Sequence, residues 1–269
     1  MQLNYKIHGV LTVLLVLTGL SFYLFTPVTL FNQTLYLIFP LLATIIAFMN
    51  FKKYGLASET GRVWLWLAVG LLSWFLGEFI WYAYKYFLGL DPSISLADFF
   101  YLLAYPFLFV GLYKEYQLAK SEAKGGRKLA WLINAVALVV TALVVYFGIY
   151  KAYDPTADNL NNFFAMVYGV ADLFLVFACL LVSKVSSSYQ GGKFFRLWIL
   201  MTAGFLVYLI GDVLYAIYRE PYIEEIRPYT CIDIIWVLGY YLLSIAMLNN
   251  YFSLKLLKDK IQGIVGSLK

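Results

Sequence analysis

The sequence predicts an all-α integral membrane protein of eight transmembrane helices, built as two parallel four-helix repeats with both termini in the cytoplasm. Composition, eight long apolar stretches and an internal similarity predict this fold class. Of the 269 residues, 63% are hydrophobic and 13% are charged, and the mean hydropathy is +0.78. Soluble domains are typically about one quarter charged, so this chain has too little charge to cover a globule in water. We therefore expect a multi-pass protein of the cell membrane with the lipid bilayer as its first partner.

Eight stretches are long and apolar enough to cross the hydrocarbon layer, which takes about 20 residues of helix. In order, they cover about 7–25, 30–51, 62–86, 95–117, 130–150, 161–183, 195–218 and 229–250. The first stretch follows a lysine as a signal peptide would, but its bulky end, 21–25, lacks the small residues of a cleavage site. We expect it to be a retained span.

Lysine and arginine residues predict the orientation, because they concentrate in cytoplasmic connections. All but four of the 20 lie in the N-terminus, in the connections after the second, fourth and sixth spans, and in the tail. The other four are Lys85, Lys151, Arg219 and Arg227. Both termini are therefore expected in the cytoplasm. The net charge of +5 reflects this topology and does not indicate nucleic acid as a partner.

The second half of the chain is similar to the first. An offset of 134 residues aligns Gly77-Glu78 with Gly211-Asp212, and an offset of 135 aligns Asp98 with Asp233. Other aligned pairs are Trp74 and Tyr208, Trp81 and Tyr215, Lys85 and Arg219, Tyr101 and Trp236, and Tyr105 and Tyr240. We infer a first repeat at 1–128, a second repeat at 129–254 and a basic cytoplasmic tail at 255–269. An even number of spans in each repeat gives both repeats the same orientation.

Glu78 and Asp212 are the first candidates for a functional site. Helical spacing places an aromatic residue and a base on the same face as each acid: Trp81 and Lys85 in one span, Tyr215 and Arg219 in the other. A carboxylate that faces lipid is costly, so both acids should face the bundle interior. Two interpretations stay open, an ion pair with Lys85 or Arg219, and a polar cavity for a ligand, a cation or a proton.

Asp98 and Asp233 lie where the next spans begin. Ser95-x-x-Asp98 and Thr230-x-x-Asp233 are both typical of a capping box, and an acid in the first turn complements the helix dipole. We expect capping to be the main role of both acids, with one carboxylate oxygen left to face the cavity.

Asp172 and four aromatic residues complete the candidate cavity. Asp172 lies near the middle of the sixth span and has no acidic counterpart in the second, so it is protonated, hydrogen-bonded to a nearby Tyr or Ser, or functional. Tyr101, Tyr105, Trp236 and Tyr240 follow Asp98 and Asp233 by three or seven residues and face the same way. Tyr105 and Tyr240 lie too deep for the aromatic belt at the interface, which favours hydrogen bonding or a cavity wall.

The sequence indicates no cofactor, no metal site and no set of catalytic residues. His8 is the only histidine, and Cys179 and Cys231 are the only cysteines. A bis-histidine haem site or a three-histidine zinc site needs more imidazoles than this. A non-catalytic function is therefore favoured, although an enzyme is not excluded.

The second-copy motifs resemble a region of known signalling proteins. Gly211-Asp212-x-x-Tyr215, followed by Asp233-Ile234-Ile235-Trp236-Val237-Leu238-Gly239-Tyr240, resembles the multi-helix N-terminal membrane sensor regions of bacterial and archaeal diguanylate cyclases and histidine kinases. The stretch 97–106 is similar to the first-copy version. Only a short basic tail follows Asn250, so the resemblance implies a sensor module without an output domain, which signals through a separate protein.

Three functions follow as hypotheses. The first is a membrane receptor or sensor module that binds a small molecule, a lipid or an ion in an outward-facing cavity between the repeats. The second is a cation- or proton-coupled transporter, which the same acids and the repeat also favour. The third is an intramembrane lipid hydrolase with paired carboxylates as acid and base, similar to small eight-span lysoplasmalogenase-type enzymes. It ranks last because no nucleophile or metal set is visible.

Overall fold

The computed structural model of the chain describes residues 2–25, 27–90, 94–120, 127–151, 153, 155, 159–186 and 192–267. These residues are helical almost throughout, and no strand occurs among them. The predicted basic tail continues the last helix to Ser267, but the side chains of 255–269 lie outside the described part. The connection at 121–126, which carries part of the predicted cytoplasmic charge, also lies outside it.

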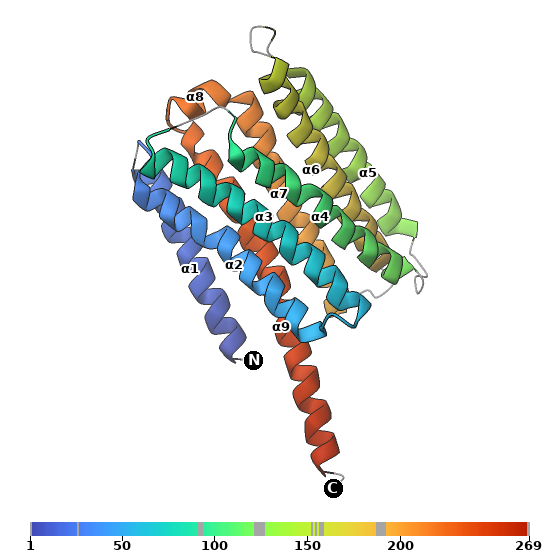
Figure 1. The fold of residues 1–269 in the computed structure, drawn as a ribbon. Helices are drawn as coiled ribbons and strands as arrows, with labels where there is room; N and C mark the ends of the chain where they lie inside the picture. Colours follow the sequence, from blue (N-terminus) through green and yellow to red (C-terminus); the bar gives the residue numbers. More distant parts are fainter. Residues whose placement is uncertain are drawn as a thin grey trace.

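The helices follow the order of the predicted spans (Figure 1). They are α1 (Gln2–Leu24), α2 (Leu30–Tyr54), α3 (Glu59–Phe87), α4 (Leu96–Lys120), α5 (Arg127–Leu143), α6 (Asn159–Ser186), α7 (Lys193–Ile217), α8 (Arg219–Ile223) and α9 (Ile232–Ser267). A π-helix, η1 (Val144–Lys151), continues α5, and a 3₁₀-helix, η3 (Tyr229–Cys231), leads into α9. Within the described ranges, eight helices are long and apolar enough to cross a membrane, which confirms the predicted number of spans.

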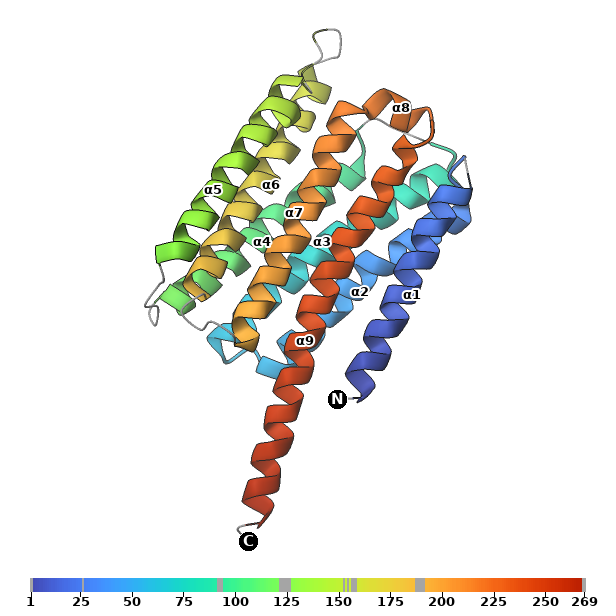
Figure 2. The same ribbon diagram turned by 180° about the vertical axis from the view of Figure 1, so that it is seen from behind.

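The long helices lie side by side in one bundle. Figures 1 and 2 show both termini at one end of the bundle and the short helix α8 at the other. Helix α3 packs against α4, and α7 packs against α9. Helix α2 contacts both α3 and α9, while α6 contacts both α7 and α4. These six helices surround the site described below, and α1 and α5 lie outside them (Figures 1 and 2).

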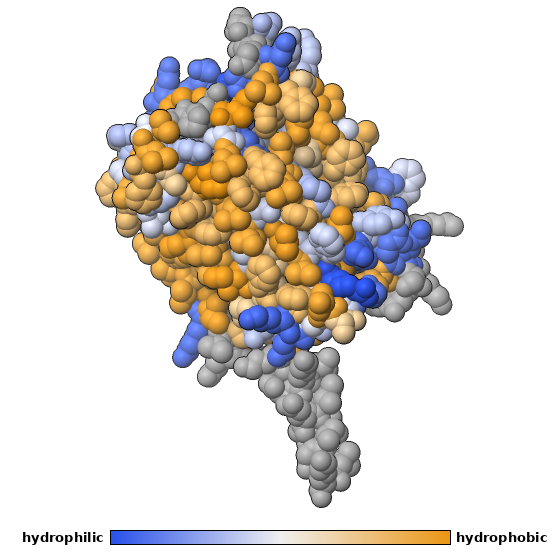
Figure 3. Space-filling model, viewed as in Figure 1, coloured by the Kyte–Doolittle hydropathy of each residue, from blue (hydrophilic) through white to orange (hydrophobic). Residues whose placement is uncertain are grey.

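The outside of the bundle is apolar, as a lipid-facing surface requires. Large hydrophobic side chains are exposed along the helices, for example Val13 on α1, Leu138 on α5 and Ile210 on α7. Figure 3 shows hydrophobic residues over most of the face in view, with hydrophilic residues gathered towards the ends. An apolar surface this broad is unusual for a soluble monomer but suits a multi-pass membrane protein.

Glycines bring α3 and α7 close to their partner helices at the level of the candidate acids. A Cβ atom on Gly77 would lie 2.7 Å from Cδ1 of Tyr101 on α4. A Cβ atom on Gly211 would lie 2.6 Å from Cδ1 of Trp236 on α9. Only a residue without a side chain leaves room for these rings, as small residues do in membrane helix packing generally. Each glycine thus places an aromatic side chain beside the acid that follows it.

We expect Gly77→Ala to destabilise the bundle by about 1–3 kcal/mol, because the added methyl group overlaps the Tyr101 ring. Gly9→Ala is the matched control, since a Cβ atom on Gly9 in α1 meets no atom within 4 Å. Thermal unfolding in detergent should show a lower Tm for the Gly77 variant alone. Equal Tm values for the two variants would contradict the close approach of α3 and α4.

Candidate functional site

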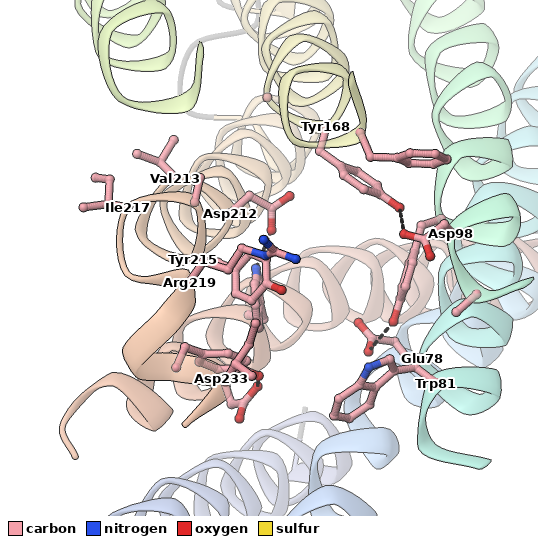
Figure 4. Close-up of a pocket in the computed structure, with 18 of the residues that line it drawn as sticks. Glu78, Trp81, Asp98, Tyr168, Asp212, Val213, Tyr215, Ile217, Arg219 and Asp233 are labelled. Carbon is pink, nitrogen blue, oxygen red and sulfur yellow. Dashed lines mark hydrogen bonds between the residues drawn. The ribbon is translucent and has the colours of Figure 1, made fainter. Parts of the chain in front are cut away.

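A cavity of about 520 Å³ lies within the bundle, towards the end that carries α8. Its size is in the range of small-molecule sites. Residues from α2, α3, α4, η1, α6, α7, α8 and α9 line it. In Figure 4, Glu78, Trp81 and Asp98 lie on one side of the cavity, and Asp212, Arg219 and Asp233 lie on the other. Candidate acids that are far apart in the sequence therefore share one space.

Glu78 is held by tyrosine hydroxyls from three other helices. Its Oε1 atom accepts hydrogen bonds from Tyr36 on α2 at 2.7 Å and from Tyr240 on α9 at 3.3 Å. Its Oε2 atom accepts from Tyr101 on α4 at 3.0 Å (Figure 4). The side chain is buried. Both carboxylate oxygens thus have donors without any cation.

The ion pair of Glu78 with Lys85, which was one of the two open interpretations, does not form. Lys85 Nζ pairs with Glu225 Oε1 at 3.0 Å and lies 5.1 Å from the centroid of the Trp81 ring. Lys85 is seven residues beyond Glu78, about 10 Å along the helix axis, where the segment after α8 supplies a nearer acid. Arg219 lines the cavity and makes no ion pair with any residue in the described ranges.

Asp98 makes one of the two hydrogen bonds of the predicted capping box, while the Ser95 hydroxyl caps the neighbouring residue, and Asp98 also reaches the cavity. Its Oδ2 atom accepts from the backbone N–H of Ser95 at 2.7 Å, and Ser95 Oγ accepts from the N–H of Ala97 at 3.1 Å. Its Oδ1 atom accepts from the hydroxyl of Tyr168 on α6 at 2.7 Å (Figure 4). One carboxylate oxygen therefore caps α4 while the other joins α4 to α6 at the cavity wall.

The capping box predicted for Thr230 and Asp233 is wrong. Thr230 belongs to η3, which runs directly into α9, so its backbone is not at the start of the helix. Asp233 Oδ1 accepts from the Tyr222 hydroxyl at 2.9 Å. Asp233 Oδ2 and Thr230 Oγ1 are buried and have no hydrogen-bond partner among the described residues. Both residues line the cavity.

The hydroxyl of Tyr222 keeps its proton in this position. Burial raises the pKa of Tyr222 well above its usual value, and the nearby carboxyl group of Asp233 raises it further. Tyr222 therefore acts as a stable hydrogen-bond donor to Asp233 at neutral pH. The second oxygen of Asp233 remains available for another donor.

Asp212 and Asp172 form a pair of neighbouring acids. Trp236 Nε1 donates to Asp212 Oδ1 at 2.6 Å, and the hydroxyl of Tyr105 donates to Asp172 Oδ1 at 2.7 Å. The two carboxyl groups also lie close enough to interact directly. Asp212 lines the cavity, whereas Asp172 lies buried behind it. Of the three interpretations for Asp172, hydrogen bonding to a tyrosine is confirmed.

All but one of the remaining aromatic candidates line the cavity. Trp81, Tyr101, Tyr105, Tyr215 and Trp236 line the cavity, while Tyr240 lies behind Glu78. Several lining residues were not among the sequence candidates: Tyr36, Trp74, Tyr168, Tyr208, Tyr222, Glu225 and Thr230. The alignment of Trp74 with Tyr208 was a signal for two of them. Tyr36, Tyr168 and Tyr222 do not stand out among the 24 tyrosines of the chain. Glu225 does not stand out either, because it is an acid in a short loop.

The floor of the cavity is an aromatic stack. The rings of Trp74 on α3 and Tyr208 on α7 are 4.6 Å apart between centroids and 10° from parallel. Tyr105 and Tyr240 meet the Trp74 ring edge-on at 5.7 and 6.1 Å. Trp74 and Tyr208 lie one turn below Glu78 and Asp212 on the same helices, towards the end with the termini. The stack thus closes the cavity from that end.

No group of three or more histidine, cysteine, aspartate or glutamate side chains is placed to hold a metal ion, as far as the chain is described. Comparison of the chain with protein-family models gave no match, and comparisons with curated proteins and with solved structures gave none either.

The two capping sequences should respond differently to substitution. Ser95→Ala removes a formed cap and should cost about 1 kcal/mol of stability. Thr230→Val replaces a hydroxyl that has no partner in the described structure with a methyl group of similar shape, and should be neutral or slightly stabilising. Thermal unfolding of the two variants beside the wild type measures the difference. An equal loss in both would mean that Thr230 also caps its helix.

Proposed function

We propose that the chain is a membrane receptor or sensor-type module that binds a small molecule, a lipid or an ion in this cavity. The observation that carries the proposal is the pair of cavity-lining polar groups, on Asp233 and Thr230, that lack a partner among the described residues. An unsatisfied buried polar atom is destabilising, so a stable fold that keeps two of them beside an open space favours a ligand as the missing partner. In this proposal a separate signalling protein receives the output.

We also propose that the two halves are copies related by an axis along the membrane normal. Tyr101 donates to Glu78 just as Trp236 donates to Asp212, at aligned positions. The stack of Trp74 on Tyr208 joins another aligned pair, as expected for residues beside such an axis. These contacts support a cavity whose walls come from both repeats.

We propose that the cavity opens to the outside and that both termini are cytoplasmic. Both termini lie at the end opposite α8 (Figures 1 and 2). Of the four basic residues assigned to the outer side, Lys85, Lys151 and Arg219 line the cavity, and Arg227 lies in the connection between α8 and η3. Lys52, Lys53 and Arg62, which the charge rule assigns to the cytoplasm, lie at or beside the connection between α2 and α3.

A cation- or proton-coupled transporter is the second candidate, and one observation favours it. Glu115 is buried in the half of α4 away from the cavity, and buried acids inside membranes are commonly functional. A transport route to this acid would have to pass the stacked rings of Trp74 and Tyr208. Because this stack closes the cavity floor, we favour a receptor.

The proposed orientation predicts a labelling pattern. In a background of Cys179→Ala and Cys231→Ser, which removes both cysteines, we introduce one cysteine at a time. Leu88→Cys, just after α3, should react with a membrane-impermeant maleimide in intact cells, because Leu88 is exposed at the cavity end. Leu56→Cys, between α2 and α3, should react only in inside-out vesicles. The reverse pattern would invert the topology and overturn an outward-facing cavity.

A cavity-filling variant tests ligand binding without knowledge of the ligand. Ala216→Trp places a large ring in the cavity, whereas Ile210→Trp places it on the exposed face of the same helix. We expect a panel of amines, carboxylates, sugars, lipid headgroups and inorganic cations to include compounds that raise the Tm of the wild type and of the Ile210 variant in nanodiscs. The same compounds should leave the Ala216 variant unchanged. No shift across the panel, or equal shifts in both variants, would contradict a ligand-binding cavity.

A further inference from the structure

The acids of the cavity differ in how much hydrogen-bonding capacity remains. Both oxygens of Glu78 accept from tyrosines, and both oxygens of Asp98 accept from Ser95 and Tyr168. Asp212 accepts from Trp236 and borders a second acid. Asp233 alone among these four keeps a buried carboxylate oxygen, Oδ2, that lacks a partner in the described part of the chain. Binding capacity is therefore concentrated at one corner of the cavity.

This corner provides a hydroxyl as well as a carboxylate. Thr230 lies three residues before Asp233 and also lines the cavity. Its Oγ1 atom lacks a partner within the described ranges, and only 1% of the residue is exposed, against 3% for Asp233. A group that fits here must donate a hydrogen bond to Asp233 Oδ2, because a carboxylate oxygen can only accept, and the Thr230 hydroxyl can accept a second hydrogen bond from the same group.

The surrounding charge favours a cationic donor. Six acids line the cavity, Glu78, Asp98, Asp212, Glu220, Glu225 and Asp233, and three bases, Lys85, Lys151 and Arg219. Lys85 is paired with Glu225 at 3.0 Å, so its charge is shared between that acid and the more distant Asp233. A cation therefore finds more groups of opposite formal charge on these walls than an anion does.

The walls beside Asp233 are aromatic. Tyr222, which donates to Asp233, packs with Tyr215 and Trp236 at centroid distances between 5.1 and 6.1 Å. Across the cavity, the Lys85 ammonium lies over the Trp81 ring. Aromatic faces attract cations and accommodate apolar groups, and organic ammonium ions combine both.

We propose, resting on the ligand-binding function above, that the cavity takes an organic ammonium ion, with its charged nitrogen donating to Asp233 and Thr230 and its apolar body against the aromatic wall. A bare metal ion fits poorly, because one carboxylate oxygen and one hydroxyl are too few ligands for calcium or magnesium. A volume of about 520 Å³ leaves room for an aromatic or aliphatic group beyond the nitrogen.

The test compares three probes that share a phenyl group: 2-phenylethylamine, 2-phenylethanol and 3-phenylpropanoate. Calorimetry on the full chain in nanodiscs should show binding of the amine at least tenfold tighter than binding of the alcohol, and no binding of the carboxylate. Calcium chloride should not compete with the amine. Equal affinity for alcohol and amine, preference for the carboxylate, or displacement by calcium would overturn the proposal.

Variants of the protein then test which residues bind the nitrogen of the amine. Asp233→Asn should weaken amine binding by about 10–100-fold, the loss expected when a charged hydrogen bond is removed. Thr230→Val should weaken it several-fold in a protein whose stability is unchanged, so its result stands even if the Asp233 variant does not fold. Glu59→Gln removes an acid at the far end of α3 and should leave the affinity unchanged. Unaltered affinity in Thr230→Val would overturn the assignment.

Failure of this inference differs from failure of the proposed function. If the amine does not bind but another compound of the panel stabilises the wild type and not Ala216→Trp, the ammonium assignment falls and the receptor stands. If the amine binds and also accumulates in proteoliposomes, the ammonium assignment stands and the receptor gives way to a transporter.

Discussion

The constraint on which this structure depends is the cost of placing carboxyl groups inside an apolar bundle. A carboxylate removed from water needs hydrogen-bond donors or a cation. In the interior of this bundle, aromatic side chains supply most of the donors. Glu78 on α3 alone accepts hydrogen bonds from tyrosines of α2, α4 and α9. Asp98 joins α4 to α6, Asp172 joins α6 to α4, and Asp212 joins α7 to α9. The polar groups thus determine which helices meet around the cavity, while the apolar surface only requires that they lie in a membrane.

The cavity follows from the same arrangement. The aromatic side chains that donate hydrogen bonds to the acids are large and rigid, so they leave a space where six helices converge. The stack of Trp74 on Tyr208 closes this space from below. One corner is not satisfied by the protein itself: Asp233 and Thr230 keep unused acceptors, to judge from the described residues. A receptor needs such a point, where the fold alone is incomplete and a ligand supplies what is missing. In the proposed receptor, the larger number of acids than bases around the cavity favours a cationic ligand.

Much of this architecture could be predicted from the sequence, because hydropathy and helical periodicity are local properties. The eight spans, the inward orientation of Glu78 and the cap at Ser95 and Asp98 follow from such signals. The partner of Lys85 could not be predicted, because Glu225 lies 140 residues away and no periodicity connects the two residues. Tyr36 and Tyr168 were missed because their spans carry little of the repeat signal. The spacing of Thr230 and Asp233 matches that of Ser95 and Asp98 and so predicts a cap, but η3 extends the helix past Thr230.

The ammonium group proposed at the Asp233 corner of the cavity can be located by crystallography. The most direct measurement is a crystal structure of the protein with 2-(4-bromophenyl)ethylamine, in which the anomalous signal of bromine locates the ring independently of the protein map. We expect one bromine peak inside the cavity, against the wall formed by Tyr215, Tyr222 and Trp236, with the nitrogen within hydrogen-bond distance of Asp233 Oδ2 and Thr230 Oγ1. A bromine peak only on the lipid-facing surface, or a nitrogen held by other acids of the cavity while Asp233 stays apart from it, would contradict it.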